Sequence, residues 1–75
     1  LWLLADPEPL VRRGGAPCLE GPLRLAAGPE RIEGGWWDGG DVSRDYYVAE
    51  TPGGRVLWVY RERRTGAWYL HGLFA

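Results

Sequence analysis

The chain has 75 residues, which is enough for one small domain. Its formal net charge of −1 and sequence pI of about 5.7 offer no overall attraction to nucleic acid. The single cysteine, Cys18, excludes an internal disulfide and a cysteine metal cluster, and no apolar run reaches the length of a membrane span. Five Trp, four Tyr and one Phe, with twelve Gly and six Pro, favour short strands and tight turns around buried rings.

The first nine residues predict an extended segment, because the two prolines at positions 7 and 9 disfavour a helix. We interpret residues 1–9 as the end of a linker between domains and residues 10–75 as a single small β domain. The absence of an initiator Met agrees with a piece of a longer protein. With one unpaired cysteine, we expect a cytoplasmic location.

Turn residues divide the next part of the chain into short strands. Residues 10–12 and 16–19 flank a Gly-Gly pair and predict a hairpin. Residues 23–25 alternate as a short strand, and the Gly28–Pro29 pair predicts another turn.

The second half gives a clearer pattern of strands. Residues 46–51 and 67–74 predict two strands, on either side of a third at residues 55–61 that is rich in β-branched and aromatic side chains. Both faces of the 55–61 strand are apolar, so we expect it in the centre of a sheet. In the 67–74 strand, alternation puts Tyr69, His71 and Leu73 on one face. The residues expected in the core are Trp58, Trp68, Leu70 and Phe74.

These segments together predict an all-β fold. Strand-sized pieces at close, regular spacing indicate a small antiparallel meander of about five to six short strands, forming a curled sheet or a small barrel. No segment shows a sustained helical period.

The polar residues give no catalytic or metal-binding constellation. Asp38, Asp41 and Asp45 do not have the spacing of a calcium loop, and we interpret them as a polar turn. His71 and Ser43 are each the only residue of their type and lie in no nucleophile motif, so His71 is interpreted as a structural hydrogen-bonding residue. No phosphate-binding glycine motif is present. We therefore expect no enzymatic activity, no metal and no cofactor.

Two binding functions remain open. Arg61, Arg63 and Arg64 beside aromatic strands could contact single-stranded DNA, because rings and Arg bind bases and phosphates. The same aromatic and Arg-rich composition is typical of protein–protein interfaces. The protein partner is the preferred interpretation, and the DNA contact is the alternative.

Three blocks of sequence carry a resemblance to a known family. They are Gly21–Glu33, the run Trp36–Tyr47 with its two aromatic pairs around an acidic Gly-Gly loop, and the ending Leu57–Ala75 with its Trp-Tyr-Leu-His-Gly-Leu-Phe block. With the opening Leu1–Leu10, they resemble the C-terminal region of ImuB over nearly the whole chain. ImuB proteins are Y-family DNA polymerase homologues that have lost the catalytic acidic residues and act in bacterial damage-induced mutagenesis and translesion synthesis.

The resemblance implies a non-catalytic protein-interaction module. The family meets an ImuA-like, RecA-related protein and an error-prone DnaE-type polymerase, and its C-terminal region is implicated in such contacts. The family's sliding-clamp motif is a Gln-led peptide. Because this chain contains no Gln, clamp contact is expected only through an upstream region. The resemblance also implies a bacterial cytoplasm in a nucleoid context, and no membrane contact is expected. The predicted partner-binding residues are Trp36, Trp37, Asp38, Asp41, Tyr46 and Tyr47.

Overall fold

The computed structural model describes residues 1–34 and 42–74. Over these ranges the chain forms seven strands and no helix. The strands are β1 (Trp2–Pro9), β2 (Val11–Arg13), β3 (Ala16–Cys18), β4 (Arg24–Glu33), β5 (Ser43–Glu50), β6 (Val56–Glu62) and β7 (Trp68–Leu73).

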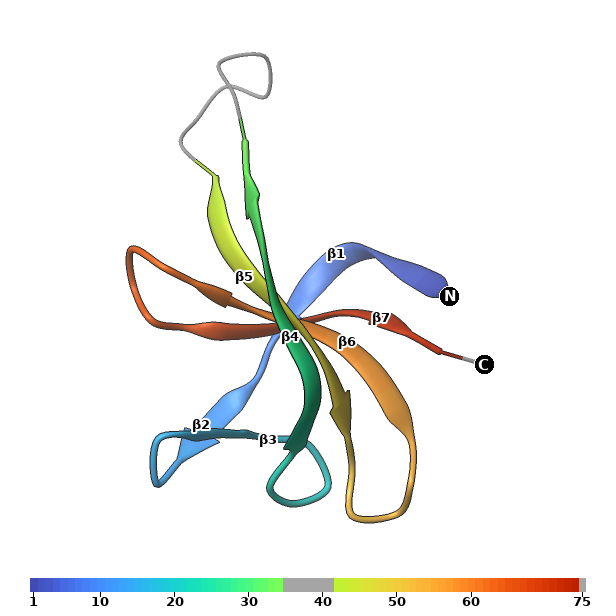
Figure 1. Cartoon of the computed structure of the whole chain (residues 1–75). Helices are drawn as coiled ribbons and strands as arrows, with labels where there is room; N and C mark the ends of the chain where they lie inside the picture. The colour runs from blue at the N-terminus through green and yellow to red at the C-terminus, as the bar shows by residue number, and fades with distance from the viewer. Residues whose placement is uncertain (35–41, 75) are drawn as a thin grey trace.

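Five of the strands form one antiparallel sheet in the order β1-β7-β6-β5-β4, and β2 and β3 form a separate two-stranded hairpin. The strands of the large sheet twist strongly and fan out in Figure 1, where the two chain ends lie near each other. The sheet does not close on itself, because β1 and β4 stay at its edges. The predicted all-β meander is confirmed, in its open, curled form.

The predicted central strand is the middle strand of the sheet. β6 alternates as expected, with Leu57 and Val59 fully buried on one face and Trp58 and Tyr60 on the other. Because β6 is paired on both sides and covered on one face, its β-branched and aromatic residues suit this position.

The apolar core lies on the Leu57 face of the sheet. It consists of Leu23, Ala49, Leu57, Val59, Trp68 and Leu70. The segment between β1 and β4 contributes to it, since Leu10 and Leu19 pack against the core and Pro17 is fully buried. Each large buried side chain removes enough apolar area from water to contribute about 1.5–3 kcal/mol to folding.

Two of the four predicted core residues lie outside the core. Trp58 is on the opposite face of the sheet, where it stacks on Tyr46, because β6 turns Leu57 and Val59 to the core. A β-bulge in β7 explains the other, Phe74. Val59 pairs with Leu70 but Trp58 pairs with Gly72, so His71 is the extra residue of β7. The bulge shifts the alternation by one position. Leu73, predicted on the opposite face, therefore packs against the core, whereas Phe74, predicted in the core, is 37% exposed.

Two segments of the first half also differ from the predictions. Residues 24–33 form one long strand, and the Gly28–Pro29 pair, predicted as a turn, is an irregularity in its pairing with β5. A tight approach requires glycine there, because a Cβ on Gly28 would lie 2.6 Å from the Tyr46 carbonyl oxygen. Residues 1–9 are extended as expected, yet β1 pairs with β7, so the assigned linker end lies within the sheet.

Candidate interaction surface

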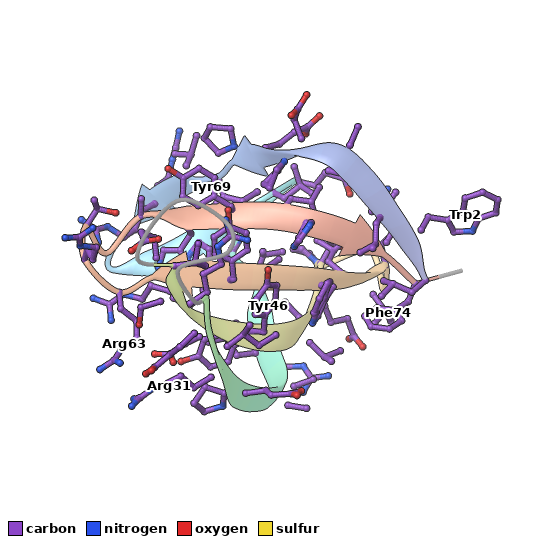
Figure 2. The ribbon with its side chains drawn as sticks, turned by 90° about the horizontal axis from the view of Figure 1, so that it is seen from above. Trp2, Arg31, Tyr46, Arg63, Tyr69 and Phe74 are labelled. Carbon is purple, nitrogen blue, oxygen red and sulfur yellow. The ribbon has the colours of Figure 1, made fainter. Side chains whose placement is uncertain are left out.

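An apolar groove lies at one end of the sheet, where β1 and β7 bring the chain ends together. It has a volume of about 590 Å³ and is lined by Trp2, Gly54, Arg55, Val56, Leu73 and Phe74. The Trp2 side chain is 70% exposed and, in Figure 2, extends away from the ribbon on the same side as Phe74. Leu1 and Leu3 are exposed beside it. Exposed apolar side chains that gather around a groove are typical of a docking surface.

Strand pairing positions the groove. Trp2 pairs with Leu73, and the Phe74 amide donates to the Val56 carbonyl at 3.0 Å. The strands approach closely here, since a Cβ on Gly72 would lie 2.9 Å from the Trp2 carbonyl oxygen. The exposed rings are therefore held on a well-paired part of the backbone.

A second feature is a cluster of rings on the sheet face opposite the core. We call it the aromatic cluster, and it consists of Tyr46, Trp58, Tyr60, Tyr69 and His71. Tyr46 pairs with Tyr60 and Tyr60 with Tyr69, so the rings follow one row across β5, β6 and β7. Tyr46 stacks on Trp58 with centroids 4.2 Å apart, and Trp58 stacks on His71 at 5.1 Å. Cross-strand ring pairs of this kind stabilise a sheet.

Polar contacts hold the aromatic cluster in place. The Tyr46 hydroxyl lies 2.8 Å from His71 Nδ1, and Arg44 Nη1 donates to the same hydroxyl at 3.2 Å. The Arg44 guanidinium also lies over the Tyr60 ring, 4.4 Å from its centroid. Burial lowers the pKa of His71 below its ordinary value, and the nearby Arg44 charge lowers it further. A neutral His71 can accept a hydrogen bond from the Tyr46 hydroxyl at Nδ1, which fits this arrangement.

Of the predicted partner-binding residues, Trp36, Trp37, Asp38 and Asp41 lie outside the described residues. The other two predicted residues, Tyr46 and Tyr47, lie in β5, on opposite faces of the sheet. Tyr46 is 3% exposed within the aromatic cluster, and Tyr47 is half-buried against Trp68, with ring centroids 5.4 Å apart. Both therefore support the fold, and neither exposes a whole ring to a partner.

The three arginines of the alternative prediction have different neighbours. Arg63 faces Glu33 at 3.9 Å and Asp45 at 3.8 Å, and Asp45 also faces Arg31 at 3.4 Å. Figure 2 shows Arg31 and Arg63 at the end of the molecule away from Trp2. The Arg64 backbone amide donates to the Glu62 carboxylate at 2.9 Å, and Arg61 lies at the end of β6, opposite Trp68.

In the part of the chain that the structure describes, no group of three or more His, Cys, Asp or Glu is arranged to hold a metal ion. Nor does any helix in residues 1–34 and 42–74 have the length and hydropathy needed to cross a membrane. The geometry described above is therefore that of a surface made of rings and charges.

Sequence reasoning missed the apolar groove. Its signal was present, because residues 1–5 are Leu-Trp-Leu-Leu-Ala and carry no charge. Assigning this segment to a linker concealed that pairing with β7 would hold Trp2 in place beside Phe74. The bulge at His71, which turns Phe74 outward, has no signal in the alternation pattern.

Comparison with known proteins gives one family. The chain is 37% identical over 65 residues to Protein ImuB of Caulobacter vibrioides, both in strain NA1000 / CB15N and in strain ATCC 19089 / CIP 103742 / CB 15. The match covers 69% of this chain, which spans about 14% of the length of these curated relatives. No family model and no solved structure matches the chain. The resemblance seen in the sequence is thereby confirmed: this chain is similar to a segment of ImuB.

Proposed function

We propose that this chain is a non-catalytic protein-interaction module of an ImuB-like protein in damage-induced mutagenesis. In this proposal it docks an ImuA-like, RecA-related protein and an error-prone DnaE-type polymerase. The similarity to a segment of ImuB supports the mutagenesis context. The two partners are those that the family resemblance implies.

The observation that carries the proposal is the apolar groove. Trp2 is 70% exposed and Phe74 37% exposed, although an 8.4 kDa domain has few large apolar side chains to leave outside its core. An exposed Trp costs free energy in water that burial against a partner would recover. Trp is also the residue type most often found at the energetic centre of an interface.

Docking a protein is favoured over binding single-stranded DNA. Stacking of bases needs accessible ring faces, whereas Tyr46 and Tyr60 are 3% and 4% exposed. Arg63 already faces two carboxylates, so a phosphate would have to compete for it. The weakly acidic chain adds no general attraction to a phosphate backbone.

The partner-binding residues predicted from the sequence divide into two groups in this proposal. Trp36, Trp37, Asp38 and Asp41 stay predicted partner contacts. Tyr46 and Tyr47 in β5 are given a supporting role, since their rings pack against Trp58 of β6 and Trp68 of β7. Partner contact would then involve the groove and the four predicted contacts.

The proposal is tested by capture of the two partners on the immobilised chain, beside a titration with single-stranded DNA at low and high salt. Trp2→Ala and Phe74→Ala are each expected to weaken partner binding about tenfold or more. Ile32→Ala is the matched control, because Ile32 is a 40% exposed apolar residue on the far edge strand β4. It is expected to change binding less than twofold.

Two results would count against the proposal. Absence of both partners from the captured material would contradict protein docking. Tight DNA binding that falls steeply with added salt, through release of counterions, would favour the alternative function.

A further inference from the structure

Two arginines from distant parts of the chain meet at the turn between β6 and β7. Arg12, in β2, donates from Nη1 to the Gly66 carbonyl at 3.3 Å. A Cβ built on Gly66 would lie 3.6 Å from that same nitrogen and 3.3 Å from Arg61 Nη2. Both guanidiniums therefore face one small volume beside Gly66, although Arg12 and Arg61 are far apart in sequence.

The turn that holds this pair is well defined by backbone hydrogen bonds. The Gly66 amide donates to the Glu62 carbonyl at 2.7 Å, and the Glu62 amide donates to the Ala67 carbonyl at 2.8 Å. Gly66 has a φ of +75°, a conformation that favours glycine, and a side chain there would press against Arg61 Nη2. The backbone of the turn therefore lets both guanidiniums lie close to Gly66.

Most other arginines with side-chain contacts already have a carboxylate. Arg24, Arg31, Arg55 and Arg63 each lie within 4 Å of one. Among residues 1–34 and 42–74, by contrast, no carboxylate forms such an ion pair with Arg12 or Arg61, and both side chains belong to exposed residues. Two like charges held at one place repel each other, and an anion between them would reverse the sign of that interaction.

We propose that Arg12 and Arg61 form a binding site for a carboxylate on an acidic segment of the protein partner. This inference rests on the proposed docking function and adds a second, polar anchor to the apolar groove. Guanidinium forks bind carboxylates with paired, charge-assisted hydrogen bonds. A single pair of arginines in a chain of net charge −1 suits an isolated carboxylate better than a nucleic-acid backbone, which needs an extended basic surface.

The test is a titration of the isotopically labelled chain, followed through the Arg side-chain NMR signals. The probe is a capped hexaglutamate peptide, and a hexaglutamine peptide and a six-residue oligothymidylate are run in parallel. Hexaglutamate is expected to shift the Arg12 and Arg61 signals together, with one saturation curve, and hexaglutamine is expected to shift neither.

Variants decide whether the two arginines act as a pair. Arg12→Gln and Arg61→Gln are each expected to weaken hexaglutamate binding about fivefold, and the double variant little more, because either loss breaks the bridge. Arg13→Gln is the matched control, since neighbouring residues of a strand point to opposite faces. It removes the same charge and is expected to weaken binding less than twofold. Near-UV circular dichroism checks that the variants fold. If Arg61→Gln does not fold, Arg61→Lys, which keeps the charge but lacks the planar guanidinium, replaces it in the titration.

Three outcomes would overturn the site. If Arg13→Gln weakened hexaglutamate binding as much as the other two variants, the attraction would be one of diffuse charge. If oligothymidylate bound more tightly than hexaglutamate, the pair would belong to a nucleic-acid contact. If hexaglutamate left the Arg12 and Arg61 signals unshifted, it would not bind there. Capture of the partners separates this inference from the proposed function. Partners that bind equally to the wild type and to the two Gln variants would remove the site alone. Hexaglutamate binding without any captured partner would remove the docking function alone.

Discussion

At one end of the sheet Trp2 and Phe74 expose their rings around an apolar groove, whereas at the other end Arg31 and Arg63 face Asp45 (Figure 2). The two ends share the strands β6 and β7, so the difference lies in what the chain places beside them. At the apolar end the exposed groups lack a cover, and at the charged end Arg31 and Arg63 have carboxylate partners. A composition rich in both Trp and Arg therefore does not show which of these side chains are available to a partner.

The core beneath both ends is where the largest loss of stability is expected. Leu57 is fully buried in the middle strand, so Leu57→Ala removes apolar contacts and leaves a cavity. We expect the free energy of unfolding to fall by about 2–5 kcal/mol, which is a large part of the stability of a domain of this size. Urea unfolding followed by Trp fluorescence measures it. A loss below about 1 kcal/mol would mean that the core contributes little to stability and does not hold the two ends of the sheet together.

Glycine at position 72 keeps the apolar end together. A Cβ there would approach the Trp2 carbonyl oxygen to 2.9 Å and the Leu1 side chain to 3.0 Å. Gly72→Ala is therefore expected to push β1 from β7 and to cost about 1–3 kcal/mol. Hydrogen exchange should show the loss first in the amides of residues 2–3.

The control for this change is Gly53→Ala. A Cβ on Gly53 would meet only the Thr51 hydroxyl, at 3.9 Å, which is ordinary contact. Its effect is expected to stay within about 0.5 kcal/mol, or to be slightly stabilising through the unfolded chain. If both changes gave the same loss, the close approach of β1 to β7 would not be responsible.

The sheet was predictable from the sequence where the information was local. Alternation in residues 55–61 put Leu57 and Val59 together on one face and the strand in the centre, although it did not show that this face, and not that of Trp58, covers the core. The Gly-Gly hairpin formed between residues 11–13 and 16–18 as expected. Such features depend on near neighbours in the chain. The bulge at His71 was not predictable in this way, because the extra residue depends on how β7 pairs with β6.

The site was less predictable than the sheet, for the same reason. The predicted rings of β5 turned out to be supports, and the exposed ring that the structure adds, Trp2, stands in a segment assigned to a linker. The pair of Arg12 and Arg61 arises only when β2 meets the β6–β7 turn. Contacts between distant residues carry this information, and no periodicity in a single sequence records them.

The aromatic cluster between the two ends predicts a dependence of stability on pH. Burial, with a further contribution from Arg44, lowers the pKa of His71 below 6.5 in the folded state. The unfolded chain therefore binds the proton first as the pH falls. We expect the His71 contribution to be complete above about pH 6.5 and to be lost below it, down to the folded pKa, at no more than about 1.4 kcal/mol per pH unit.

Urea unfolding at pH 7.5, 6.5 and 5.5 measures this dependence. His71→Gln cannot titrate in this window, so its stability should change less between these pH values than that of the wild type. An equal change in both proteins would assign the dependence to other groups and leave His71 without a role in it.

The smallest effect is expected at the charged end. The side chain of Arg63 is 39% exposed, and its contacts with Glu33 and Asp45 are long, at 3.9 and 3.8 Å. Exposed pairs of this kind contribute little, so Arg63→Gln is expected to lower the free energy of unfolding by less than about 1 kcal/mol, and by less still at high salt. Thermal unfolding at roughly 20 mM and roughly 500 mM NaCl measures both the loss and its salt dependence. A loss comparable to that of Leu57→Ala would mean that the charged end holds the sheet together. A small loss with unchanged partner capture would show that Arg63, already facing two carboxylates, serves neither the fold nor docking.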